Sequence, residues 1–83
     1  MRQEDLIEAL RRRPFQPFRM HVTDGTIYEV RHPEMVLVNR STAFVFSPAP
    51  NLPAPAVSKL ETVALLHIIR FDPMETPAAP TNN

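Results

Sequence analysis

The sequence predicts a mostly β protein, in which an N-terminal α-helix is followed by a small five-stranded antiparallel barrel. Three observations support this prediction. The ten prolines leave the stretches 18–32, 34–47 and 56–72 free of proline, and proline is excluded from helix interiors and central strands. Within these stretches apolar residues alternate with polar ones, as they do in half-buried strands. The connections between them are too short for the crossovers that a parallel sheet needs.

Length and composition restrict the class of protein. The chain has 83 residues and a formal net charge of zero, so it is at most one domain and has no overall field that would attract nucleic acid. A domain of this size is only marginally stable alone, and oligomerisation is a common remedy. The absence of cysteine excludes disulfides and thiolate zinc sites. Residues 1–5 mix charges of both signs and are not the pattern of a secretory signal, and no apolar run reaches about 20 residues, so we expect a cytoplasmic protein without membrane partners.

Residues 3–12 are expected to form the helix. Leu6, Ile7 and Leu10 share one face at helical spacing. Acidic residues precede this apolar stripe and the three arginines at 11–13 follow it, which matches the helix dipole at both ends. The next residue is a proline, which disfavours helical geometry in the residue before it. The helix should therefore end at the arginines.

The first two strands, 18–23 and 26–31, are expected to form a hairpin around Asp24-Gly25. A two-residue loop would place Glu29 among apolar side chains. A three-residue loop brings the apolar faces together and gives the only glycine the positive φ that it tolerates best, beside a bulge. We therefore predict the register of the longer loop, with the pairs Val22–Thr26, Met20–Tyr28 and Phe18–Val30.

The rest of the sheet is expected from the remaining apolar segments. His32-Pro33 breaks the second strand, and an unbroken apolar run of strand length follows at 35–38. Residues 42–47 alternate again. The proline-rich residues 48–55 predict an extended loop. Further strands are expected at 57–63, where the signal is weaker, and at 67–71.

These elements are expected to make one domain, residues 1–72. The residues from 73 to 83 are rich in proline and contain too few large apolar side chains to form a core, which predicts a disordered tail. The pattern of a helix followed by short strands and short loops is typical of an SH3- or Sm-like barrel. The predicted core consists of Leu6, Leu10, Phe18, Met20, Val22, Tyr28, Val30, Val36, Val38, Phe44, Phe46, Leu66, Ile68 and Phe71.

Two family resemblances run along the chain. Residues 6–13 are similar to the N-terminal helix of the bacterial Sm-like Hfq family, residues 35–39 to its long bent apolar strand, and residues 67–73 to its last strand. This resemblance spans residues 5–73. It implies ring oligomers that bind RNA, including through arginines at the end of the helix, and it would make Arg11, Arg12 and Arg13 the RNA contacts of a rim.

The second resemblance is to a group of short uncharacterised bacterial proteins. It lies in residues 14–19, in Thr23-Asp24-Gly25 and in residues 29–34. It implies a bacterial source and no known activity.

The sequence contains no arrangement that predicts catalysis. His21, His32 and His67 do not form a tight ligand pair, and a metal site needs three or four converging ligands. We therefore expect structural or surface roles for the histidines, no metal site, no cofactor and no enzymatic activity.

Two functions stay open at this point. The first is a non-enzymatic interaction or assembly module, which binds copies of itself or another protein. The second is an Sm- or Hfq-like RNA-binding protein that uses Arg11, Arg12, Arg13 and Arg19. The net charge of zero favours the first function. The cluster of arginines, whose guanidinium forks suit phosphate, favours the second.

Overall fold

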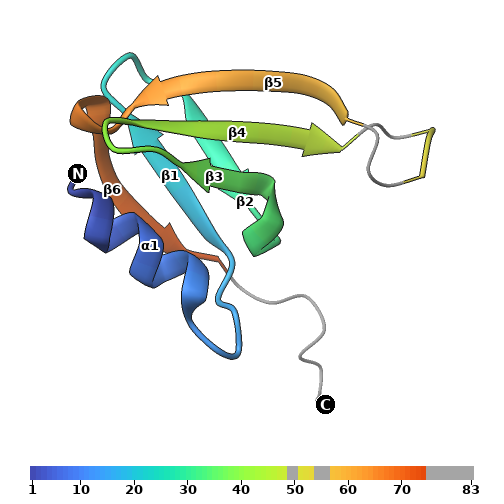
Figure 1. Cartoon of the computed structure of the whole chain (residues 1–83), viewed down its shortest axis with the longest axis horizontal. Coiled ribbons are helices and arrows are strands. Elements are labelled where there is room, and N and C mark those ends of the chain that lie inside the picture. The colour runs from blue at the N-terminus through green and yellow to red at the C-terminus, as the bar shows by residue number, and fades with distance from the viewer. Residues whose placement is uncertain (49–50, 54–56, 75–83) are drawn as a thin grey trace.

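The computed structural model describes residues 1–48, 51–53 and 57–74. It confirms a mostly β protein with one N-terminal helix (Figure 1). In chain order its elements are the helix α1 (Gln3–Arg11), the strands β1 (Phe18–Val22) and β2 (Ile27–Val30), the 3-10 turn η1 (Pro33–Met35), the strands β3 (Val36–Val38), β4 (Thr42–Pro48) and β5 (Val57–Ala64), the 3-10 turn η2 (Leu65–His67) and the strand β6 (Ile68–Pro73).

The strands form two antiparallel sheets of three strands each, with the orders β2–β1–β6 and β3–β4–β5. The expected barrel is therefore not closed, because no strand pairing joins the two sheets among the described residues. The six strands correspond to the six segments that the sequence predicts as strands, so the expectation of a five-stranded barrel is wrong in its count. Pro33 opens η1, where its missing N–H is no loss, and this turn sends β2 and β3 into different sheets.

Helix α1 ends one residue earlier than the sequence predicts. Arg12 already has extended backbone angles, with φ −61° and ψ 139°, so the last helical residue is Arg11. Leu6 and Leu10 are buried in the core, as expected, whereas Ile7 is only half-buried. The helix has nine residues, and in the described ranges no helix is long and apolar enough to cross a membrane.

The hairpin between β1 and β2 has the predicted register. Gly25 has a φ of 92°, a conformation that glycine adopts without steric cost. Oδ1 of Asp24 accepts a hydrogen bond of 2.9 Å from the backbone N–H of Thr26, which fixes the turn. The three predicted pairs are present: Met20–Tyr28, Phe18–Val30 and Val22–Thr26.

The side chains of β4 lie on the opposite faces from those predicted. Ala43 and Val45 are buried, whereas Phe44 and Phe46 are half-buried and do not belong to the core cluster or to the side chains packed against it. Val45 lies opposite the buried Val36 of β3. The prediction that the two phenylalanines face the core is therefore wrong.

The composition of the core gives the physical reason for this correction. Its fully buried large side chains include Leu6 of α1 and Met20 of β1. The helix and the sheet β2–β1–β6 therefore fill most of the interior, and the sheet β3–β4–β5 contributes smaller residues to it. Tyr28, Val38 and Phe71 are partly buried and pack against the core. The predicted core residues that are buried are Leu6, Leu10, Phe18, Met20, Val22, Val30, Val36 and Ile68.

The turn η2 corrects a second core assignment. Leu66, which the sequence places in the core, is 82% exposed, whereas its neighbour Leu65 is 4% exposed. The short 3-10 turn directs these two adjacent side chains to different sides, and only one of them can reach the interior. Val63 and Met74 are further buried residues that the prediction lacks.

The proline-rich loop and the tail fall partly beyond the described residues. Pro48 ends β4, residues 51–53 are exposed, and the remaining residues of the predicted loop, 49–50 and 54–55, lie outside the described ranges. At the other end β6 runs to Pro73, and the N–H of Met74 donates to the carbonyl of Pro17 at 2.9 Å. The rest of the predicted tail, 75–83, is not among the described residues.

Candidate functional site

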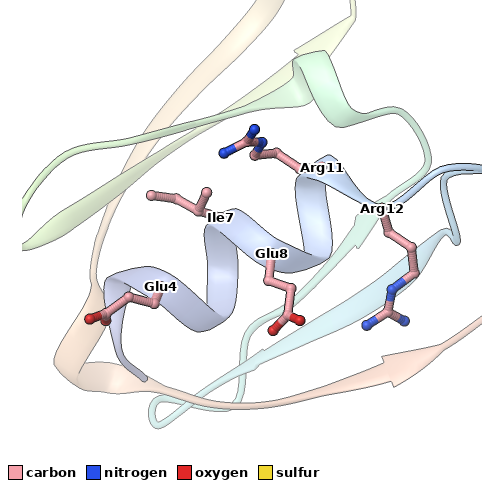
Figure 2. A pocket seen from close by; sticks show the side chains of 5 residues that line it. All are labelled: Glu4, Ile7, Glu8, Arg11 and Arg12. Atoms are coloured by element: carbon pink, nitrogen blue, oxygen red, sulfur yellow. The ribbon is translucent and has the colours of Figure 1, made fainter.

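The arginines at the end of α1 do not point to a common centre. Ile7 and Arg11 project from one side of the helix, and Glu8 and Arg12 project from another (Figure 2). Together with Glu4 these residues line an open depression on the surface of the helix. Two carboxylates thus share this surface with two guanidinium groups, and they weaken the positive potential that a phosphate group would experience there.

Arg13 is turned back onto the helix. Its Nη1 donates to the carbonyl of Leu10 at 3.3 Å and to the carbonyl of Arg12 at 2.9 Å. The last carbonyls of a helix have no partner within the helix, and a basic side chain near the C-terminus can satisfy them. Arg13 therefore caps α1.

Arg19 belongs to a different part of the molecule. Its Nε lies 3.3 Å from Oε2 of Glu29 on the neighbouring strand, and Nη2 of Arg31 lies 2.7 Å from Oε1 of the same carboxylate. These two guanidinium groups, Arg31 first, lower the pKa of Glu29. Of the four arginines that the sequence predicts as RNA contacts, only Arg11 and Arg12 thus share a surface, while Arg19 lies in a cross-strand ion-pair network.

The three histidines lie apart. His21 on β1 has its Nε2 at 2.7 Å from Oδ2 of Asp72, and Nε of Arg70 donates to Oδ1 of the same carboxylate at 3.2 Å. His67 has its Nδ1 at 3.3 Å from Oγ1 of Thr23, and His32 is exposed at the start of η1. In the part of the chain that the structure describes, no group of three or more histidine, aspartate and glutamate residues could hold a metal ion.

The outer side of the sheet β3–β4–β5 carries an apolar surface that the sequence analysis missed. Leu37 lies opposite Phe44, and Phe46 lies opposite Leu60. The two leucines are each 56% exposed. We call these four residues the outer apolar face. The signal in the sequence is that β4 has apolar residues at both odd and even positions, so that whichever set is buried, the other set lies outside.

Strand β5 forms one edge of this sheet. It is eight residues long and pairs with β4 alone among the described strands, and Figure 1 shows it along the margin of the molecule. Lys59 and Glu61 lie on the side of β5 opposite to Leu60, and their Nζ and Oε1 atoms are 4.0 Å apart. A free strand edge presents backbone donors and acceptors that another strand can use.

A groove separates the edges of the two sheets. Tyr28 of β2 and Thr26, which directly precedes this strand, line it on one side, and Glu61 of β5 lines it on the other. Burial and the nearby carboxylate of Glu61 raise the pKa of the Tyr28 phenol. The charged side chains of β5, Lys59 and Glu61, therefore face this groove, whereas Leu60 between them belongs to the outer apolar face.

Comparison of the chain with protein-family models, with curated proteins and with solved structures gives no match.

Proposed function

We propose that this chain is a non-enzymatic assembly module, which associates with copies of itself through the sheet β3–β4–β5. The observation that supports this proposal most is the combination of the outer apolar face with the free edge of β5 beside it. Contiguous exposed apolar residues of this kind are typical of interaction sites, and a free strand edge favours association by strand pairing.

The size of the chain supports the same proposal. A domain of this length buries a small fraction of its surface, and association is a common way to add buried area. In the sheet β3–β4–β5 the leucines of β3 and β5 are more than half exposed, so their burial in an assembly would add stability that the single chain lacks.

The molecular mass in solution tests the proposal. Light scattering across a wide range of concentrations should give a multiple of the chain mass of 9.5 kDa. Leu60→Lys should reduce the association, because it places a charge on the outer apolar face beside the edge. Leu66→Lys is the matched control, since Leu66 is the most exposed of the large apolar residues and lies outside the sheet. A mass of 9.5 kDa at every concentration would rule out self-assembly.

RNA binding at the end of α1 is the second candidate function. In its favour, Arg11 and Arg12 are both exposed, and no carboxylate of the described residues lies within ion-pair distance of either guanidinium. Binding of oligo-U and oligo-A should weaken as salt rises if phosphates are contacted. The double variant Arg11→Ala/Arg12→Ala should weaken it further, whereas Arg40→Ala, an exposed arginine elsewhere, should not. Unchanged affinity of the double variant would exclude this surface.

A further inference from the structure

The backbone of β5 shows which of its groups face the free edge. The N–H of Leu65 donates to the carbonyl of Ser41 at 2.9 Å, and this pair continues the register in which β5 lies against β4. Hydrogen-bonded and non-hydrogen-bonded pairs alternate along an antiparallel ladder. Leu60 and Thr62 are therefore in non-hydrogen-bonded positions with respect to β4, and their N–H and C=O groups point to the free edge.

The side chains of β5 separate charge from apolar surface. Lys59 and Glu61 are on the side of the groove, and Leu60 between them lies on the outer apolar face opposite Phe46. A lysine and a glutamate thus flank the leucine at equal distances along the strand. A second copy of β5 running in the opposite direction presents the same two charges in reverse order.

One register of β5 against a second β5 places opposite charges across from each other. In a two-fold symmetric pair centred on Leu60, Lys59 lies across from the partner's Glu61, and Glu61 lies across from the partner's Lys59. A pair centred on Lys59 or on Glu61 would place like charges directly opposite, which is destabilising. A shift by one residue would bring the outer face of one strand against the inner face of the other.

We propose that two copies of this chain form a dimer through antiparallel pairing of β5 with the partner's β5, centred on Leu60. This inference rests on the proposed function and adds the contact surface and its register. The sheet β3–β4–β5 of one copy and the same sheet of its partner become one continuous sheet of six strands. Their outer apolar faces join where Leu60 meets the partner's Leu60. Such an interface uses the same patch on both copies, so assembly stops at the dimer.

Reversal of one charge at a time tests the register of β5 against the partner's β5. In a homodimer of Lys59→Glu the introduced glutamate faces the partner's Glu61 in both symmetric pairs, and in a homodimer of Glu61→Lys the introduced lysine faces the partner's Lys59. We expect the dimer dissociation constant of each variant to rise roughly tenfold. A mixture of the two variants should associate like the original chain, because both cross-strand pairs then join opposite charges. Sedimentation equilibrium of each variant and of the mixture measures this difference.

A cysteine cross-link tests the centre of the pair. The chain has no cysteine, so Leu60→Cys introduces a single thiol. In the proposed dimer the two copies of this residue are a hydrogen-bonded pair with Cα atoms about 5.5 Å apart, which is within the range of a disulfide. Mild oxidation should give a covalent dimer. Thr62→Cys is the matched control on the same face of β5, and its two copies are separated by about 13 Å along the strands, so it should stay uncross-linked.

The outcomes distinguish this interface from the proposed function. A chain that stays at 9.5 kDa at every concentration overturns both. A chain that dimerises while Leu60→Cys forms no disulfide overturns the β5 interface and leaves self-assembly standing, and so does a mixture of the charge variants that associates no better than each variant alone. An assembly larger than a dimer without this cross-link means that the copies associate through another surface, and it also overturns the inference.

Discussion

Leu37 on β3 lies directly opposite Phe44 on β4, and neither side chain belongs to the core. The next pair along the same two strands, Val36 and Val45, is buried, with exposed fractions of 3% and 4%. The sheet β3–β4–β5 thus has apolar residues on both faces, and the rest of the described chain covers only one of them. The uncovered face is the physical basis of the proposed self-assembly.

The assignment of the two faces can be tested on adjacent residues of β3. Val36→Thr keeps the shape of the side chain but buries a hydroxyl, and we expect it to lower the free energy of unfolding by about 1–3 kcal/mol. Leu37→Thr, at a position that is 56% exposed, should lower it by less than about 1 kcal/mol. Urea denaturation of both variants at one fixed protein concentration measures the difference. A larger effect for Leu37→Thr would mean that the faces are reversed.

The orientation of α1 gives a second prediction from neighbouring residues. Leu6 is completely buried, and Leu6→Ala should lower the free energy of unfolding by about 2–5 kcal/mol, since it removes buried apolar volume and leaves a cavity. Ile7 is half-buried on the surface of the helix, so Ile7→Ala should have less than half of that effect. The same denaturation experiment compares the two variants. Equal effects would contradict the structure, in which Leu6 and not Ile7 is directed to the core.

The turn of the β1–β2 hairpin gives a third prediction. A Cβ atom added at Gly25 would meet nothing within 4 Å, so the effect of Gly25→Ala comes only from the positive φ of 92°. We expect a loss of about 1–2 kcal/mol in the free energy of unfolding. Gly25→Asn should lose less, because asparagine tolerates left-handed backbone better than alanine. Thermal or urea unfolding is the measurement, and an alanine variant as stable as the original chain would be inconsistent with this turn.

The hairpin was predictable from the sequence because two independent constraints agree there. Alternation requires that Met20 lie opposite Tyr28, and the chain has one glycine for the residue that needs a positive φ. Both signals are local. They fix a register without any knowledge of how the rest of the chain packs.

The faces of β4 and the choice between Leu65 and Leu66 were not predictable in this way. Both alternating sets of β4 are apolar, and two adjacent leucines in a turn carry no periodic signal. Which of them is buried depends on the volume that the helix and the first sheet leave in the core. Size and hydrophobicity favour the aromatic residues of β4 for the interior, but the space beside Val36 and Val63 accommodates Ala43 and Val45.

The candidate sites also combine features that local sequence signals predict with features that depend on the folded structure. The exposure of Arg11 and Arg12 was predictable, because they follow the apolar stripe of a short helix. The capping role of Arg13 and the ion pair between Arg19 and Glu29 depend on local geometry that spacing does not give. The free edge of β5 could not be found from the sequence, since it follows from the order of strands in the two sheets.

The carboxylate of Asp72 predicts a dependence of stability on pH. A hydrogen bond from Arg70, and to a smaller extent one with His21, lowers the pKa of Asp72 below its ordinary value. The unfolded chain therefore takes up this proton at a higher pH than the folded chain does. The contribution of Asp72 to stability is present above the ordinary pKa of an aspartate, about 4, and is lost as the pH falls through the lower pKa of the folded state.

Asp72→Asn should remove this part of the pH dependence. We expect the variant to be less stable than the original chain near neutral pH, with a difference that shrinks as the solution is acidified from about pH 5 to about pH 2. Urea denaturation at a series of pH values measures both curves. Some dependence should remain in the variant, because the pKa values of Asp24 and Glu29 are also lowered. Two curves that stay parallel over the whole range would show that the contacts of Asp72 with Arg70 and His21 do not stabilise its charged form.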